Sequence, residues 1–473
     1  MSDFSRRDFL KFSGAGAIAA ALPVTTSAAH VPAPKGTVRA WVTNSNQKHA
    51  ALPELRWSSA KRGGNSIVVE PTTEYQSVLG FGAAFTDAAC YTLNRLDAKS
   101  RADLFHTLFH PSEMGLSVSR ICIGSSDYSR NVYSYCEGSE PDPEMTRFSI
   151  DHDRAYILPI LREARAVNPD LWLLGSPWSP PAWMKFNGSM LGGCMRNNWY
   201  DAYANYFEHF LDAYAEAGVP VQSVTTQNEV DTDQDGRMPA CVWPQEYELA
   251  FVREHLGPRM EKAKHPADIW ILDHNYNLWG RALCELEDTQ ARKYVKGIAW
   301  HGYVGSPEAM TRVQQAYPNV DQFWTEGGPD FEHPGYATEW TKWAEQFTGI
   351  LRNRARCIIG WNYALDENGK PNIGPFQCAG MVTVHSQTAA ITYSGQYWAM
   401  EHFSRHIRRG AKILGSSGEI KDLHHVAARN PDGTYSLVLT NSGASEQRTQ
   451  VKVGGAAVEV SVAPDSIMTI SWS

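Results

Sequence analysis

Two glutamates stand at the ends of short apolar segments that are typical of β-strands. The first segment, VQSVTTQNEV at 221–230, contains Asn228 and Glu229, and the second, DQFWTEGG at 321–328, contains Glu326. The two glutamates are too far apart in the sequence to share one helix face or one hairpin. They can meet only in a fold that gathers distant strand ends, as a (β/α)8 barrel does at the C-terminal ends of its strands.

Two carboxylates on one face suit hydrolysis of a glycosidic bond with retention of configuration. One carboxylate attacks the anomeric carbon and the other protonates the leaving oxygen, with about 5 to 5.5 Å between them. Glu326 would be the nucleophile, and its charge would raise the pKa of Glu229 and keep that group protonated. Asn228 would bind the sugar 2-hydroxyl. A lone glutamate at a strand end is more often solvated or ion-paired, so the inference depends on the pair.

Strand and helix patterns alternate eight times along the middle of the chain, which predicts parallel strands with crossover helices. The expected strands are 78–85, 117–123, 171–176, 221–227, 268–273, 297–301, 321–325 and 356–363. The expected helices are 98–109, 150–167, 199–217, 245–256, 281–292, 307–316, 338–352 and 396–406. Glu229 and Glu326 therefore follow strands four and seven. The loops after strands two, three, four and eight are long, which is typical of a binding face.

The patterns at the two chain ends are those of strands without helices. Beyond Ala411 we expect strands at 422–429, 435–440, 446–453, 458–462 and 467–472, joined by turn sequences such as NPDG at 430–433. The N-terminal segments 37–43 and 66–70 alternate like strands, with irregular chain between them, and we expect them to complete a small antiparallel β-domain. The predicted fold is α/β, a (β/α)8 TIM barrel with a side β-sandwich built from both chain ends.

The N-terminus has the features of an export signal. Arg6 and Arg7 precede an apolar run at 12–22, and Ser27-Ala-Ala29 supplies small residues for a signal peptidase. The run is too short for a stable membrane anchor. We therefore expect twin-arginine export to the periplasm or beyond. The predicted domains are a signal peptide at 1–29, linker and sandwich strands at 30–77, the catalytic barrel at 78–407 and the C-terminal sandwich at 408–473.

Composition excludes some partners. The formal net charge of −8 and the absence of a Lys/Arg block argue against a nucleic-acid surface. The 16 Trp and 20 Tyr favour a carbohydrate cleft because aromatic faces stack on sugars, although core packing accounts for most of them. The eight cysteines form no CxxC pair and have no metal-ligand spacing, so we expect neither a metal nor a cofactor.

A set of short motifs recurs in order between residues 78 and 405. They are GFGAAFTD at 80–87, SRICIGSSD at 119–127, SPWSPPAWMK at 176–185, TQNE at 226–229, HGY at 301–303, WTE at 324–326 and GWN at 360–362. In these motifs the chain resembles glycoside hydrolase family 30, the glucosylceramidase-like retaining β-glycosidases. The resemblance implies a (β/α)8 barrel with a side β-sandwich, no cofactor, and a β-linked glycoside or oligosaccharide as substrate.

The resemblance also implies a role for each matching residue. Glu229 would be the acid/base and Glu326 the nucleophile, and the sugar would be bound by Asp87, Trp178, Asn228, Tyr303 and Trp361. Core packing is the alternative for the two tryptophans, and a helix N-cap is the alternative for Asp87. Asp127 and His301 are expected either in the site wall or directly behind it.

The substrate is less well determined by these motifs. Val230 stands where the family usually has proline. The loop 231–236 is unusually acidic, and the loop 366–377 also departs from the family's pattern. We expect a β-glucoside of the glucosylceramidase or β-glucosidase type, with β-1,6-glucans, β-xylosides and β-fucosides as alternatives. Two other classes stay open: a non-catalytic carbohydrate-binding protein, and a metal-dependent hydrolase using Asp273, His274 and His301.

Overall fold

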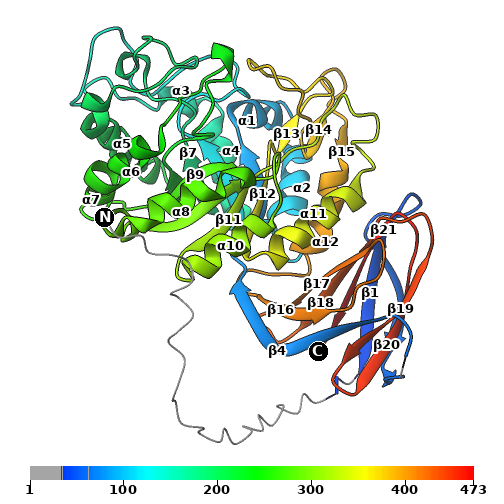
Figure 1. Ribbon diagram of the computed structural model, residues 1–473. Coiled ribbons are helices and arrows are strands. Elements are labelled where there is room, and N and C mark those ends of the chain that lie inside the picture. The colour runs from blue at the N-terminus through cyan, green and yellow to red at the C-terminus, as the bar shows by residue number, and fades with distance from the viewer. Residues whose placement is uncertain (1–32, 35, 62) are drawn as a thin grey trace, which may run out of the picture.

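The computed structural model describes residues 33–34, 36–61 and 63–473, which form a barrel and an adjoining β-sandwich (Figure 1). The predicted signal peptide at 1–29 lies outside the described residues. Among the residues described, no helix combines the length and apolar character needed to cross a membrane.

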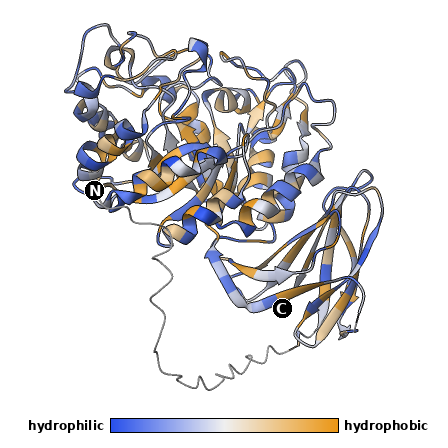
Figure 2. Ribbon diagram, viewed as in Figure 1, coloured by the Kyte–Doolittle hydropathy of each residue, from blue (hydrophilic) through white to orange (hydrophobic). Residues whose placement is uncertain are grey.

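Eight parallel strands close the barrel in chain order, as predicted. They are β5 (Gly80–Phe85), β6 (Val118–Cys122), β7 (Trp172–Ser176), β8 (Ser223–Thr225), β9 (Asp268–Asn275), β10 (Val295–His301), β11 (Asp321–Glu326) and β12 (Ala355–Gly360). All six residues of β5 are buried, because one face packs inside the barrel and the other lies under the helices. Figure 2 shows this apolar centre, with polar residues towards the outside.

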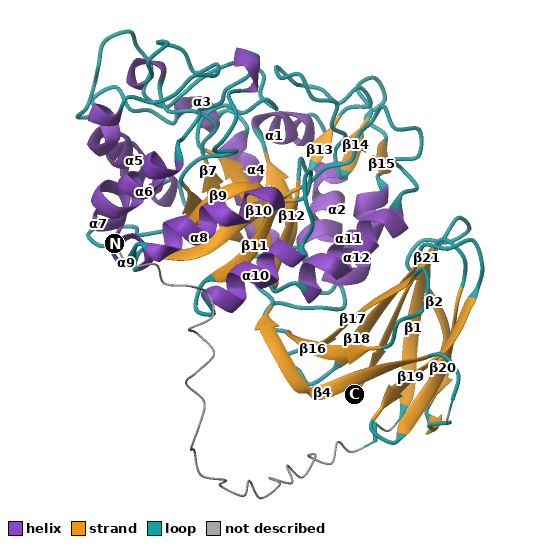
Figure 3. Ribbon diagram, viewed as in Figure 1, coloured by secondary structure: helices purple, strands orange, loops and turns teal. Residues whose placement is uncertain are grey.

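Helices surround the strands, as Figure 3 shows. The main ones are α1 (Asp87–Asn94), α2 (Ala98–Phe109), α4 (Ile157–Val167), α5 (Tyr200–Glu216), α6 (Gln245–Ala250), α8 (Trp279–Glu287), α10 (Glu308–Ala316), α11 (Trp340–Arg352) and α12 (Gly395–Ser404). The short α9 (Thr289–Arg292) follows α8. All of them except α1 overlap a predicted helix, because each has an apolar face that the barrel buries.

Three helix predictions were wrong in detail, and one of them, the helix expected at 281–292, is divided into α8 and α9 by the extended residue Asp288. The helix expected at 150–167 is interrupted: α3 (Asp151–Arg154) ends before Tyr156, whose non-helical φ of −153° separates it from α4. The helix expected to stop before Gly257 instead continues through a π-helical turn, η5 (Phe251–Leu256), into α7 (Gly257–Met260). Pro258 is the second residue of α7, which directly follows this π-helical turn.

The sandwich is a ten-stranded sheet with the order β2-β1-β21-β18-β17-β16-β4-β19-β20-β3. Strands from the two chain ends are interleaved in it, and Figure 1 shows blue N-terminal strands among orange and red C-terminal ones. The N-terminal strands are β1 (Thr37–Thr43), β2 (Ala50–Arg56), β3 (Ser58–Ser59) and β4 (Ser66–Ser77). The C-terminal strands are β16 (Lys412–Ser417), β17 (Leu423–Arg429), β18 (Tyr435–Asn441), β19 (Gln447–Val453), β20 (Ala456–Val462) and β21 (Ser466–Trp472).

Four features of the sheets differ from prediction, and the first is that β16 was not among the expected strands. β2 and β3 occupy the chain that was expected to be irregular, since β2 gains its order from pairing with β1. β19 pairs with β4 in parallel, so the sheet is not wholly antiparallel. After β12, a small extra sheet of β13 (Ala364–Leu365), β14 (Val382–Val384) and β15 (Ile391–Tyr393) stiffens the last long loop of the barrel.

Histidines fill the junction between α12 and the sandwich. The ring of His402, on α12, lies between the hydroxyl of Thr43 on β1, at 2.9 Å, and that of Thr469 on β21, at 2.8 Å. Next to it, the Nε2 atoms of His49 and His406 are 3.0 Å apart. Burial lowers the pKa of all three rings, to about 4 for His49 and well below the usual value for His402 and His406. The junction is therefore built for neutral imidazoles.

We predict that acid weakens this junction. Below pH 6.5 the unfolded chain binds protons at these histidines, whereas the buried rings of the folded chain stay neutral. The contribution of the rings to the free energy of unfolding is therefore fully present above pH 6.5 and falls as the pH drops below it. For His49 the loss is about 2 kcal/mol at pH 5. Thermal unfolding of the mature protein between pH 7.5 and 4.5 measures this loss. His406→Gln should flatten the pH dependence, whereas His424→Gln, at a partly exposed position in the sandwich, should not. Equal slopes in both variants would refute the prediction.

Candidate functional site

A cavity of about 600 Å³ opens at the C-terminal ends of the barrel strands. Seven of the nine residues singled out from the sequence line it: Asp127, Trp178, Asn228, Glu229, Tyr303, Glu326 and Trp361. His301 lies directly behind the wall, and Asp87 is not part of it. The barrel therefore brings together side chains that the sequence spreads over about half of its length.

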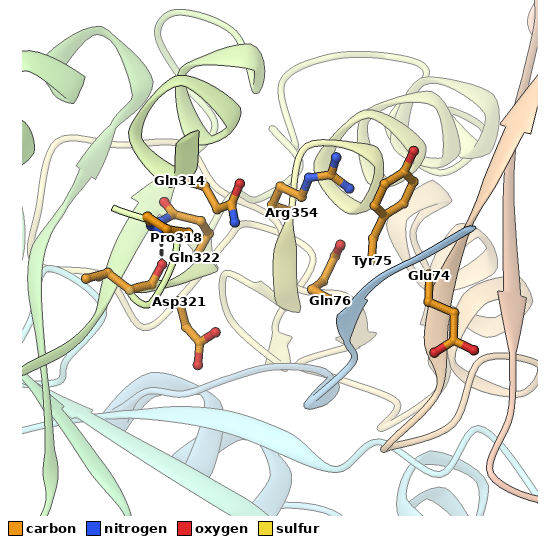
Figure 4. Close-up of a pocket in the computed structure, with 9 residues that line it drawn as sticks. Glu74, Tyr75, Gln76, Gln314, Pro318, Asp321, Gln322 and Arg354 are labelled. Carbon is orange, nitrogen blue, oxygen red and sulfur yellow. Dashed lines mark hydrogen bonds between the residues drawn. The ribbon is translucent and has the colours of Figure 1, made fainter. Parts of the chain in front are cut away.

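A second cavity lies at the opposite end of the barrel (Figure 4). It measures about 370 Å³ and borders Gln76 of β4 and Asp321, the first residue of β11. The guanidinium of Arg354 stacks 3.7 Å above the ring of Tyr75 there. The N-terminal ends of barrel strands serve stability rather than catalysis. The cavity at the C-terminal ends of the barrel strands is therefore the candidate site.

Glu229 lies in the loop that follows β8, where its backbone is held in place. Its N–H donates to the carbonyl of Asp273 at 3.0 Å, and its φ of +53° lies in the left-handed region, which is uncommon for a residue with a side chain. Such strained backbone is concentrated at functional sites. The side-chain Oε2 accepts a hydrogen bond from Gln234 at 2.8 Å, and Oε1 lies 3.7 Å from His274 and 3.5 Å from His301.

Glu326 is the last residue of β11 and faces the same cavity. Its Oε1 accepts a hydrogen bond from the Tyr303 hydroxyl at 3.1 Å, and its Oε2 accepts one from Arg120. The Nε2 atom of His301 is 3.9 Å from Oε2. Since the other nitrogen of the same ring lies 3.5 Å from Glu229, the two glutamates flank a single imidazole.

Arg120 links these groups from inside the barrel. Its guanidinium is fully buried and donates to Asp273 at 2.7 Å and to Asn228 at 2.6 Å, in addition to Glu326. It also lies 4.6 Å from the ring centroid of Trp178. Sequence reasoning missed this residue, although an arginine inside the buried strand VSRIC was a signal, because a charge is rarely buried unless it is paired.

Asp273 is the common acceptor at the centre of the site. Beyond Arg120, it accepts hydrogen bonds from the hydroxyls of Thr225 at 2.7 Å, Ser176 at 2.9 Å and Thr325 at 2.8 Å. His301 is 3.0 Å away. Burial opposes its charge, but Arg120 and His301 outweigh burial and hold its pKa far below the usual value. Asp273 is therefore a fixed anion that orients its neighbours.

The pKa of Glu229 is shifted in the direction opposite to that expected from Glu326. Burial acts to raise it, but contact with His301 and His274 outweighs burial and lowers the pKa. Burial also acts against the charge of His301, but Glu326, Asp273 and Glu229 raise the pKa of that ring to about 9. The two histidines thus decide the charge of Glu229 in the free protein.

The two predicted aspartates differ in position. Asp87 opens α1 behind the cavity wall, where its oxygens accept from the Arg130 N–H at 2.8 Å and the Tyr156 hydroxyl at 2.7 Å. The N-cap of α1 is its neighbour Thr86. Asp127 lines the cavity, and its buried Oδ1 has no hydrogen-bond partner among the described residues. Burial, together with Glu326 and Glu229, raises the pKa of Asp127 well above its usual value.

Aromatic rings form part of the cavity surface. Trp178 and Trp361 are buried and stacked, with centroids 5.2 Å apart and an angle of 22° between their planes. They therefore both pack the interior and line the cavity, so the two alternatives for them are not exclusive. At the mouth, Tyr303, Val304 and Phe376 are each exposed by 40% or more.

Potential metal-binding groups also meet here. Glu229, His274 and His301 are three residues whose donor atoms lie within 4.8 Å of one another. The eight cysteines, all in the described part of the chain, are free thiols.

Three family models match the chain. The glycosyl hydrolase family 30 TIM-barrel domain matches residues 78–407, and the family's beta sandwich domain matches 410–470. The twin-arginine translocation pathway signal sequence matches 3–23. The last match confirms the predicted export route.

Characterised proteins of similar sequence carry two kinds of name. The endo-1,6-beta-D-glucanase of Neurospora crassa is 31% identical over 395 residues, which cover 80% of this chain and 81% of the relative. The lysosomal acid glucosylceramidase of Mus musculus is 28% identical over 437 residues, covering 87% and 85%.

Solved structures agree over nearly the whole chain. SrfJ from Salmonella typhimurium superposes with a TM-score of 0.88 at 27% identity, and the match covers 92% of this chain and 99% of SrfJ. The endo-beta1,6-glucanase BT3312 gives 0.84 at 28% identity, covering 93% and 100%. With both domains matched by the family models, the chain belongs to glycosyl hydrolase family 30 and is a glycoside hydrolase.

Proposed function

We propose that this exported enzyme hydrolyses β-linked glucosides with retention, through a covalent glycosyl-enzyme intermediate. The observation that carries the proposal is the pair Glu229 and Glu326 on either side of His301, at the wall of one cavity. Two facing carboxyl groups are the usual catalytic machinery of a retaining glycosidase.

In the first step, a carboxylate oxygen of Glu326 attacks the anomeric carbon. The glycosidic C–O bond breaks, and the leaving oxygen takes the proton of Glu229 in its acid form. Arg120 and Tyr303 orient the attacking carboxylate through its two oxygens. Substrate entry expels water from the cavity, which favours the protonated form of Glu229 and offsets the effect of the histidines in the free protein.

In the second step, Glu229 takes a proton from water, whose oxygen attacks the anomeric carbon and releases Glu326. Asn228, fixed by its bond from Arg120, would hold the 2-hydroxyl during both steps. Trp178 and Trp361 would support the sugar ring. Asp127 is the carboxyl with an unpartnered oxygen at the cavity, whereas Asp87, whose oxygens are both engaged, stays a predicted sugar contact.

A β-1,6-linked glucan is the second, more specific candidate. The cavity wall is rich in groups that hydrogen-bond sugar hydroxyls, among them Asn275, Asn277 and Gln377, and the exposed Tyr303 and Phe376 offer ring faces at the mouth. Relatives named endo-1,6-beta-D-glucanase support the same choice. Glucosylceramide is the alternative that the other relatives suggest.

Trapping of the intermediate tests the reaction. The mature protein, incubated with 2-deoxy-2-fluoro-β-glucosyl fluoride, should gain one fluoroglucosyl unit on the peptide that contains Glu326, as measured by mass spectrometry. Glu326→Gln should not be labelled, whereas Glu332→Gln, at an exposed position in the following loop, should be labelled like the wild type.

Other labelling results would change the proposal in defined ways. A label on another peptide would overturn the site. Labelling only by the xylosyl or fucosyl analogue would change the sugar, and no labelling by any analogue would favour a non-catalytic binding protein.

Arg120 tests how the nucleophile is positioned. Arg120→Lys keeps the charge but loses the planar fork that reaches three acceptors at once. We expect kcat to fall about 10²-fold or more, with a smaller change in KM. Arg259→Lys, which alters a half-buried surface pair with Glu208, should keep its kcat. Retention of wild-type kcat by a folded Arg120→Lys variant would contradict this role.

A substrate panel decides between the two named activities. We expect release of glucose or gentiobiose from β-1,6-linked oligosaccharides with kcat/KM at least about tenfold above that for glucosylceramide in detergent, a difference of about 1.4 kcal/mol. The opposite order would favour the sphingolipid. If the enzyme hydrolyses an aryl β-glucoside but neither the β-1,6-linked oligosaccharides nor glucosylceramide, the proposed mechanism stands and both natural substrates are rejected.

A further inference from the structure

We propose that Glu229, His274 and His301 form an inhibitory site for a divalent transition-metal ion such as Zn²⁺. The three residues come from the ends of neighbouring barrel strands and lie far apart in the sequence, so no linear spacing motif marks them. Their donor atoms nevertheless lie within 4.8 Å of one another. Metal binding needs only this geometry, while inhibition also rests on the proposed acid/base role of Glu229.

The distances fit a small metal ion. Oε1 of Glu229 is 3.5 Å from Nδ1 of His301 and 3.7 Å from Nδ1 of His274. In a tetrahedral zinc site, with bonds of about 2.0 to 2.1 Å, neighbouring donor atoms are about 3.3 Å apart. A contraction of a few tenths of an ångström at each of these two pairs would therefore bring Glu229 into range of both histidines. The two imidazole nitrogens, which lie within 4.8 Å of each other, would have to approach each other as well. Both distances from Oε1 of Glu229 exceed those of good hydrogen bonds, so this oxygen forms no hydrogen bond with either Nδ1 atom.

The two imidazoles present the correct nitrogen. Both Nδ1 atoms are buried and lack a hydrogen-bond partner among the described residues. The opposite nitrogens each face a carboxylate: Nε2 of His274 is 2.5 Å from Asp231, and Nε2 of His301 is 3.0 Å from Asp273. A carboxylate accepts a hydrogen bond, so each Nε2 keeps its hydrogen and each Nδ1 is the nitrogen that can bind a metal. Carboxylate–histidine–metal chains in proteins have this arrangement. Because the pKa of His301 is about 9, the ion has to displace a proton from its Nδ1.

The donor set determines which metal would bind and what it would do. Two imidazoles and one carboxylate suit Zn²⁺, Co²⁺, Ni²⁺ or Cu²⁺, whereas Mg²⁺ and Ca²⁺ prefer oxygen ligands. Three protein ligands leave a coordination position towards the cavity, which Glu229 and His274 line. A metal on Oε1 would prevent Glu229 from carrying a proton to the leaving oxygen. The bound ion would therefore switch off hydrolysis reversibly.

The test measures binding directly. Chelator-treated protein in a Cys284→Ser background, which removes an exposed thiol, is titrated with Co²⁺ by visible absorption and with Zn²⁺ by calorimetry. We expect one ion per chain, no binding of Mg²⁺, and inhibition of aryl β-glucoside hydrolysis that a chelator reverses. His274→Gln should weaken Zn²⁺ binding at least about tenfold, and Asp231→Asn should weaken it by about 10- to 100-fold.

Asp235→Asn is the matched control, because this exposed aspartate lies in the same loop and, among the described residues, forms a salt bridge only with Arg237. It should bind Zn²⁺ like the parent protein. No Co²⁺ spectrum, or equal Zn²⁺ affinity in His274→Gln and Asp235→Asn, would overturn the metal site. A protein that binds Co²⁺ but is not labelled by the fluoroglucoside would reject the proposed function and keep the metal site. A protein that is labelled by the fluoroglucoside but does not bind Co²⁺ would keep the proposed function and reject the metal site.

Discussion

The buried ion pair of Arg120 with Asp273 is the interaction on which the site depends. A guanidinium inside a barrel is costly unless anions and hydrogen-bond acceptors surround it, and here Asp273, Glu326 and Asn228 do so. Each acceptor is thereby fixed relative to the others. The same contacts that stabilise the buried charge also position a carboxylate and an amide at the cavity, so packing and chemistry share one network.

Backbone strain is concentrated at this network. Glu229 has a φ of +53° and Asp273 one of +44°, both in a region that ordinary side chains avoid, and the N–H of Glu229 donates to the carbonyl of Asp273. Strain of this kind costs of the order of 1 to 3 kcal/mol per residue and persists only where surrounding structure enforces it. The closed barrel provides that support, because every strand has two hydrogen-bonded neighbours.

His301 connects the two glutamates, and its environment has consequences for both. Asp273 holds one ring nitrogen, and the other faces Glu229 beside His274. The free protein therefore favours an ionised Glu229, and in the proposed mechanism substrate reverses this balance by excluding water. A proton and a metal ion would compete for the same oxygen of Glu229. The proposed inhibition by metal would therefore depend on the protonation state of Glu229.

The sequence by itself determined the order of strands and helices, the two glutamates at strand ends and the aromatic residues of the cavity, because periodicity and local motifs encode them. Tertiary structure alone decided three other matters. It paired Arg120 with Asp273, it placed Asp127 rather than Asp87 at the cavity, and it set histidines against Glu229, which reversed the expected shift of its pKa. It also ordered β2, whose pattern is weak, by pairing it with β1. These outcomes depend on contacts between residues distant in the chain, and pairwise electrostatics and burial follow distance in space rather than position in the sequence.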